Sequence, residues 1–276
     1  MTTGELPVPD VTVTQRLLGM AAVRGCQPAL AGSSEVDAYT YAGLAGAIQA
    51  AAAGLAWRGL HPRDVVGVLV PDAACYTLAS HAIRAAGGVP SPVAAGLPVT
   101  DIAGQLADCG ARMLLTAPPL AAAALAAADR SWVRQVISFG EAPGAIPFEA
   151  LLRAGSLRPM SGRRTDLALL PYARQPDGML SPVAMTHQEL AAELSDLAGR
   201  ADITETDIVI AAPPAGDGRA YAALLDHALI AGATVVAPTG GDLSLTATSW
   251  HGTVAIVPRC TDISGYESLR VFAVAG

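Results

Sequence analysis

The chain has 276 residues, of which 52% are hydrophobic and only 4% aromatic, and its formal net charge is −7. This length allows one large domain or two small ones, with a core built mainly from Ala, Val and Leu. The acidic balance argues against a nucleic-acid partner, because phosphate contacts need clustered cations. The chain opens without a signal peptide, and its alanine-rich run at 120–128 is too short to cross a bilayer. We therefore expect a soluble, cytoplasmic protein that has no membrane partner.

All 17 basic residues are arginine, and the sequence contains no lysine. A GC-rich genome accounts for this bias, but its consequence is chemical. Any mechanism that needs a lysine cannot be run by this chain alone. The four cysteines, Cys26, Cys75, Cys109 and Cys260, are scattered without metal-ligand spacing. We therefore expect reduced thiols and no metal site.

Helical and strand patterns alternate along the chain. Apolar periodicity predicts helices over 13–25 and 39–60, the second with Thr40 as its N-cap. The apolar run 64–70 is typical of a buried parallel strand, and a helix over 72–88 follows it, with Asp72 as its N-cap. After these we expect, in order, a short strand near 89–93, a helix at about 100–109, a strand at 112–116, an alanine-rich helix and a strand at 133–140.

A second series of elements follows a connection rich in Gly, Pro and Arg. It consists of strands at 167–172 and 183–186, a helix at 187–200, a strand at 207–213, a helix at 218–232, and strands at 233–238, 252–258 and 269–276. We predict a first α/β subdomain over 1–145, a connection over 146–165 and a second α/β subdomain over 166–276. Repeated βα units imply mainly parallel sheets flanked by helices. The last apolar strand predicts a partner that covers it, or a chain that is a cut piece.

The stretch "PYARQPDGMLSPVAMTH" at 171–187 lies between an apolar strand and a helix, where phosphate-binding loops occur. A phosphate cradle needs consecutive N–H groups that point inward and glycines that allow close approach. Here Pro176 and Pro182 each remove an N–H, and Gly178 is the one glycine. Asp177 places a negative charge where a triphosphate would lie. Arg174 offers a cation, since guanidinium binds phosphate, although a solvated loop charge explains it more simply.

Three stretches of the chain, "YTYAGL" at 39–44, 82–116 and 166–238, resemble the N-terminal domain of adenylate-forming ligases. This family includes acyl-CoA synthetases, luciferases and nonribosomal-peptide adenylation domains. Its phosphate loop aligns without a gap from Tyr172 to His187, and the position of the family's loop lysine holds Ser181. The resemblance therefore marks a vestigial nucleotide site, formed by Tyr172, Arg174, Gln175, Asp177, Gly178, Ser181, Thr186 and His187.

A second family signature, an aromatic residue and a histidine after the strand at 207–213, is replaced by Ala215 and Gly216. In the same loop Asp217 and Arg219 are further ligand candidates, although a helix N-cap explains Asp217 equally well. We interpret His187 as a cap or packing residue rather than a base. The other histidines, His61, His81, His227 and His251, are interpreted as structural or surface residues. The resemblance also implies that the family's C-terminal catalytic domain, with its lysine, is absent.

Three functions fit these observations. The favoured hypothesis is a non-catalytic homologue without catalytic residues or cofactor, which acts as an interaction or scaffold module in a biosynthetic assembly line. It requires a protein partner or self-association. The first alternative is an acyl-adenylate-forming ligase that uses ATP and Mg and takes the missing lysine from a partner chain. The second alternative is a sensor that binds acids or acyl-CoA without ATP.

Overall fold

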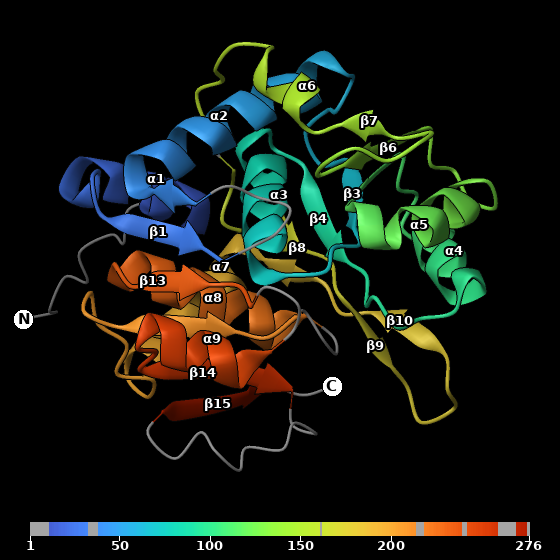
Figure 1. Cartoon of the computed structure of the whole chain (residues 1–276). Helices are drawn as coiled ribbons and strands as arrows, with labels where there is room; N and C mark the ends of the chain where they lie inside the picture. The colour runs from blue at the N-terminus through green and yellow to red at the C-terminus, as the bar shows by residue number, and fades with distance from the viewer. Residues whose placement is uncertain are drawn as a thin grey trace, which may run out of the picture.

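The computed structural model describes residues 11–32, 38–160, 162–213, 218–238, 242–258 and 269–274. Two large sheets dominate these residues, one of five strands and one of six, and helices cover both faces of each (Figure 1). This arrangement confirms the predicted α/β class with mainly parallel sheets. Among the described residues, no helix combines the length and apolar character needed to cross a bilayer.

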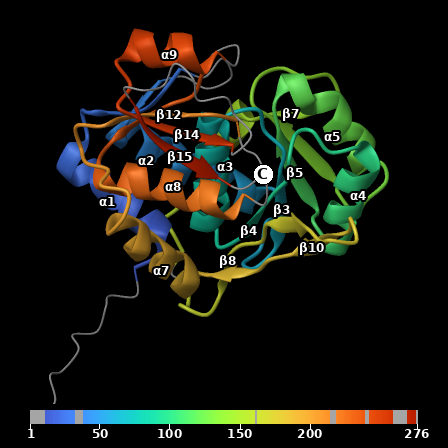
Figure 2. The same cartoon turned by 90° about the horizontal axis from the view of Figure 1, so that it is seen from below.

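The five-stranded sheet is parallel throughout. Its strands, in spatial order, are β4 (Val89–Pro92), β3 (Val65–Val68), β5 (Met113–Thr116), β6 (Gln135–Ser138) and β7 (Ile146–Pro147). Its outer face is covered by α4 (Val99–Asp108) and α5 (Ala121–Ala128), as Figure 2 shows. Leu120 of η1 (Pro118–Leu120) packs against the same cluster. Its inner face packs against α2 (Tyr41–Trp57) and α3 (Ala73–Ala85).

The six-stranded sheet is parallel except at one edge, where β1 and β2 are antiparallel. Its strands, in spatial order, are β15 (Arg270–Val274), β14 (Val254–Pro258), β12 (Ile208–Ala211), β13 (Thr234–Val236), β1 (Pro28–Ala31) and β2 (Tyr39–Thr40). Its inner face packs against α8 (Arg219–Ala231) and α1 (Val13–Arg24), and its outer face against α9 (Leu243–Trp250).

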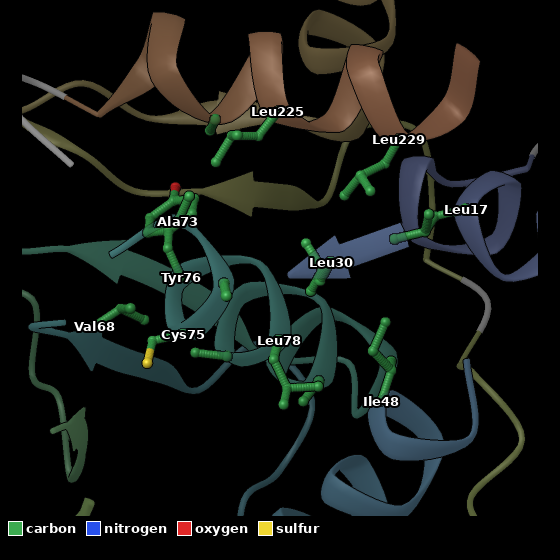
Figure 3. Close-up of a cluster of buried hydrophobic side chains, with 14 of the residues drawn as sticks. Leu17, Leu30, Ile48, Val68, Ala73, Cys75, Tyr76, Leu78, Leu225 and Leu229 are labelled. Carbon is green, nitrogen blue, oxygen red and sulfur yellow. The ribbon is translucent and has the colours of Figure 1, made fainter. Parts of the chain in front are cut away.

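The main core lies between the two sheets. Every residue of α3 is buried, which explains why this helix carries so many small side chains. Figure 3 shows Leu225 of α8 pointing toward Ala73 and Tyr76 of α3, and Leu229 pointing toward Leu30 of β1. The ring of Tyr76 also meets that of Tyr221 edge-on, with centroids 5.5 Å apart. This aliphatic and tyrosine packing joins the two halves of the chain in one hydrophobic core.

Local signals fixed the starts of several helices as predicted. The side chain of Thr40 accepts a hydrogen bond from the Gly43 N–H at the start of α2. The side chain of Asp72 accepts from two N–H groups at the start of α3. Each cap satisfies N–H groups that have no partner within the helix.

The two sheets do not follow the predicted boundary at 146–165. β1 and β2 come from the segment 1–145, yet they join a sheet whose other strands come from 166–276, and Leu30 pairs with Val235. The sequence analysis missed β1 and β2. It also missed β7 and the short α6 (Glu149–Leu152) near the predicted connection. These elements are two to four residues long, which is too short for a periodic signal.

Candidate functional site

The candidate phosphate loop folds into a β-hairpin, visible at the lower right of Figure 1. Strand β9 (Tyr172–Arg174) pairs antiparallel with β10 (Leu180–Pro182). In this pairing Ser181, at the position of the family lysine, lies opposite Ala173. Gly178 adopts the left-handed conformation that the turn requires, with φ of +85°. The Pro-Asp-Gly of this stretch is a turn signal, and it could have predicted the hairpin.

Three backbone N–H groups of the hairpin donate hydrogen bonds to acceptors within its own turn. The N–H of Gln175 donates to the Met179 carbonyl over 2.8 Å, and the N–H of Gly178 donates to the Gln175 carbonyl over 2.9 Å. The N–H of Met179 donates to the Asp177 carboxylate over 2.9 Å. Pro176 has no N–H to give. The donors that a cradle would direct at an anion are therefore bonded within the turn.

The guanidinium of Arg174, the cation of the loop, also has partners within the protein. One nitrogen of Arg174 donates to the Gly178 carbonyl over 2.5 Å, and the other lies 3.2 Å from a carboxylate oxygen of Asp101 on α4. The Arg174 side chain is 50% exposed and that of Asp101 is 34% exposed. An ion pair with this much solvent contributes only about 0–1 kcal/mol. The structure thus shows Arg174 as a closing contact of the hairpin.

Tyr172 anchors the hairpin to the five-stranded sheet and its helices. Its ring is buried, and its hydroxyl donates to the carboxylate of Asp108 at the end of α4 over 2.5 Å. Burial, together with the hydrogen bond to that carboxylate, raises the pKa of Tyr172 well above its usual range. Just upstream, Leu170 bonds to β4 through Pro90 and Ser91. Tyr172 therefore stays protonated and acts as an anchor.

Thr186 and His187 begin α7 (His187–Ala198). Thr186 is the N-cap in a reciprocal capping box with Glu189. His187 is the first helical residue, and its buried Nδ1 has no hydrogen-bond partner among the described residues. Burial, followed by the nearby charge of Arg84, lowers the pKa of His187 to about 4. The imidazole is therefore neutral at pH 7, and no hydrogen bond among the described residues joins it to the hairpin turn.

The second candidate loop precedes α8. Asp217 lies outside the described residues, as do the neighbouring Ala215 and Gly216. The N-cap of α8 is Gly218, in the left-handed conformation, so the assignment of Asp217 as N-cap is wrong by one residue. Arg219 forms an ion pair with Glu193 of α7 over 3.0 Å. This pair links two helices and lies on a different element from the hairpin.

A buried polar cluster between α3 and α8 escaped the sequence analysis. Asp226 lies 2.9 Å from a guanidinium nitrogen of Arg84 and 3.0 Å from the Nε2 of His81. The other ring nitrogen of His81 lies 3.0 Å from the Thr14 hydroxyl. His81 is thus a buried residue of the core, with polar contacts to α1 and α8. No local pattern predicts this cluster, because 142 positions separate Arg84 from Asp226.

The charges in this cluster follow from burial and pairing. Burial lowers the pKa of His81, so the imidazole is neutral. Burial alone would raise the pKa of Asp226, but the charge of Arg84, with the His81 ring beside it, outweighs burial and holds the pKa below the usual value. The cluster is therefore an Arg–Asp ion pair supported by a neutral histidine. Among the described residues, no group of His, Cys, Asp or Glu side chains is arranged to hold a metal ion.

Comparison with known proteins assigns the family. The model of the family described as AMP-binding enzyme matches residues 20–261, which is most of the chain. This protein therefore belongs to the AMP-binding enzyme family, and its fold is that of the N-terminal domain of adenylate-forming ligases. The resemblance inferred from the three sequence stretches is confirmed. No curated protein sequence matches the chain.

Several solved structures share this fold, among them two CoA ligases and the protein MbtA. A long-chain fatty acid–CoA ligase from Archaeoglobus fulgidus aligns with a TM-score of 0.81 at 19% identity, over 94% of this chain and 53% of that one. A benzoate–CoA ligase from Burkholderia xenovorans gives 0.76 at 22% identity, over 90% and 50%. MbtA from Mycobacterium smegmatis gives 0.79 at 24% identity, over 90% and 48%. The chain thus spans about half the length of these proteins.

Proposed function

We propose that this chain is a non-catalytic member of the AMP-binding family that acts as an interaction module, as in a biosynthetic assembly line. One observation supports the proposal above the others: the candidate phosphate loop is a hairpin whose N–H donors are hydrogen-bonded within the turn. The N–H groups of Gln175, Gly178 and Met179 all have partners within the turn. A triphosphate would have to break these bonds before it could be held.

The electrostatics of the hairpin support the same proposal. Phosphoryl chemistry passes through an anionic transition state that cations must stabilise. The chain has no lysine, and Arg174 already pairs with Asp101. Asp177 adds a further negative charge in the turn itself. Two carboxylates against one guanidinium form a poor site for a triphosphate.

A thermal-unfolding scan of the 276-residue chain tests this proposal. The scan compares buffer, MgCl2 alone, millimolar Mg-ATP and a non-hydrolysable acyl-adenylate mimic. A ligand present at a hundred times its Kd stabilises by about 2.7 kcal/mol. At roughly 2–4 °C per kcal/mol, that is a Tm increase of about 5–11 °C. We expect no shift with either nucleotide ligand, and a shift of this size with Mg-ATP would refute the proposal.

The alternative is an acyl-adenylate-forming ligase that receives its lysine from a partner chain. The match to the AMP-binding enzyme model over residues 20–261 favours it. The exposed pair between Arg174 and Asp101 is weak enough for a triphosphate to displace the carboxylate. This alternative predicts that Mg-ATP raises Tm and that Arg174→Ala abolishes the shift. Arg200→Ala is the matched control, since this exposed arginine pairs with Asp196 within α7.

The same scan distinguishes the sensor hypothesis. A Tm increase with a carboxylic acid or acyl-CoA, in the absence of ATP, would favour a ligand-binding protein that lacks the chemistry. Equal ATP-induced shifts in the wild-type chain and in Arg174→Ala would exclude Arg174 as the replacement cation. Each of the three functions therefore gives its own pattern of shifts.

A further inference from the structure

Two tryptophans are left largely in solvent. Trp57, the last residue of α2, is 78% exposed, and Trp132, between α5 and β6, is 59% exposed. They are two of the three tryptophans in the chain. Single exposed apolar residues are common and carry no meaning by themselves. These two tryptophans differ from single exposed residues because their segments meet at one edge of the five-stranded sheet, namely the end where β3, β5 and β6 begin.

Hydrogen bonds bring the two tryptophan segments together. The side chain of Gln135 donates to the carbonyl of Arg58, next to Trp57, over 3.0 Å. The N–H of Arg134, two residues after Trp132, donates to the carbonyl of Arg112 over 2.8 Å. These residues lie at the edge where β3, β5 and β6 begin. In Figure 1 this edge is at the top, near the end of α2, and the β9–β10 hairpin is at the bottom.

A small pocket opens at the same edge. Its volume is about 60 Å³, and its lining includes Leu60, Val65 and Met113 as apolar residues and Asp64 and Arg112 as charged ones. This volume suits one aliphatic side chain rather than a cofactor, because cofactor pockets measure roughly 300–1,000 Å³. The pocket therefore offers an anchor point beside the tryptophans.

The charge of this edge is opposite to that of the whole chain. Arg112 and Arg134 are exposed, and among the described residues their guanidinium groups make no hydrogen bond or ion pair. The guanidinium of Arg58 lies over the ring of Trp57, 5.9 Å from its centroid. Two exposed carboxylates belong to the same segments: Asp64, which lies 3.6 Å from the Nδ1 of His61, and Asp129, three residues before Trp132. In a chain of net charge −7, this is a local concentration of available cations.

We propose that this edge, formed by Trp57, Arg58, Arg112, Trp132 and Arg134, binds an acidic extended segment of a partner protein. Tryptophan and arginine are the residues that dominate the binding free energy of protein interfaces. Guanidinium groups bind carboxylates in bidentate geometry, and the adjacent pocket accepts an apolar side chain of the segment. The inference deepens the proposed interaction role and rests on it. It is independent of nucleotide, because the hairpin lies at the other end of the molecule.

The binding test uses a fluorescein-labelled, glutamate-rich peptide with one central leucine as its probe. Fluorescence anisotropy measures its affinity for the full chain. Tryptophan emission of the Trp250→Ala variant reports on Trp57 and Trp132 alone. We expect saturable binding, a blue shift of the emission, and weakening as salt shortens the Debye length from about 8 Å to 3 Å. A lysine-rich peptide with the same leucine should not bind.

Variants locate the site. We expect Trp57→Ala, and the double variant Arg112→Glu with Arg134→Glu, each to weaken binding by about tenfold or more. Trp250→Ala and Arg200→Glu change an exposed tryptophan of α9 and an exposed arginine of α7, and they should bind as the wild-type chain does. Far-UV circular dichroism of every variant shows that folding is retained.

Three outcomes would overturn the inference. The first is no binding of the acidic peptide, and the second is equal binding by the face variants and the controls. The third is tighter binding of a single-stranded oligonucleotide, which would make the face a general polyanion site. The Mg-ATP scan on the same samples separates this inference from the proposed function. If the peptide binds and Mg-ATP also raises Tm, the peptide site at this edge is supported and the non-catalytic role is refuted. If neither occurs, only the peptide site is refuted.

Discussion

Replacing Asp226 with alanine removes the carboxylate that faces Arg84 and His81 between α3 and α8. The side chains of Arg84 and Asp226 are 1% and 4% exposed, so solvent cannot take the place of the lost partner. The Nε and Nη2 of Arg84 already lack hydrogen-bond partners among the described residues. Removing one member of a buried ion pair costs about 3–5 kcal/mol. At roughly 2–4 °C per kcal/mol, Tm should fall by about 6–20 °C.

Urea denaturation followed by circular dichroism measures this loss as a decrease in the midpoint concentration. The control is Asp196→Ala, because Asp196 pairs with Arg200 on the surface with side chains 72% and 64% exposed. That change should cost less than about 0.5 kcal/mol. The double variant Asp226→Leu with Arg84→Met, which removes both charges, should recover most of the stability. If Asp226→Ala costs no more than Asp196→Ala, the argument from buried charge is wrong.

Three further predictions concern single residues. A Cβ added at Gly54 of α2 would lie 2.4 Å from a backbone oxygen of α6, whereas a Cβ at Gly46 of the same helix would meet open space. Gly54→Ala should therefore lower the free energy of unfolding by about 1–3 kcal/mol, and Gly46→Ala should raise it by up to about 1 kcal/mol. Equal urea midpoints for the two variants would refute this prediction. Burial holds the pKa of His187 at about 4 against 6.5 in the unfolded chain, so its stabilising contribution is complete above pH 6.5 and is lost as the pH falls toward 4. His187→Gln should reduce the loss of stability between pH 7 and 5, and an unchanged pH dependence in this variant would contradict the argument from burial. Thr186→Ala removes the capping box of α7 and should cost about 1 kcal/mol, measured by the same denaturation; no change would mean that the cap is replaced by water.

The sequence predicted the elements whose signals are local. Thr40 and Asp72 cap α2 and α3 as expected, because an N-cap needs only a side-chain oxygen two or three residues from a free N–H. The buried strands β3, β5 and β12 lie within the expected apolar runs, because a strand covered on both faces must be apolar throughout. The family resemblance came from the residues of three stretches, 39–44, 82–116 and 166–238, and from their order along the chain.

The candidate site was predictable only in part. The sequence indicated that the stretch from Tyr172 to His187 is a poor phosphate loop, since its two prolines and its aspartate are visible by inspection. The turn signal at 176–178 was the one local indication of the hairpin, because its ladder of three residue pairs is too short to give a strand periodicity. The partners of Tyr172 and Arg174, which are Asp108 and Asp101, lie 64 and 73 positions away and carry no local signal.

The sequence by itself determined the α/β class, the succession of βα units and the absence of any lysine to hold a phosphate. Only the tertiary structure decided which distant segments meet. It paired Leu30 with Val235 in one sheet and placed Asp226 against Arg84 and His81. The physical reason is range: hydrogen-bonded caps and apolar runs are set by neighbours along the chain, whereas strand order and buried ion pairs arise only when the core closes.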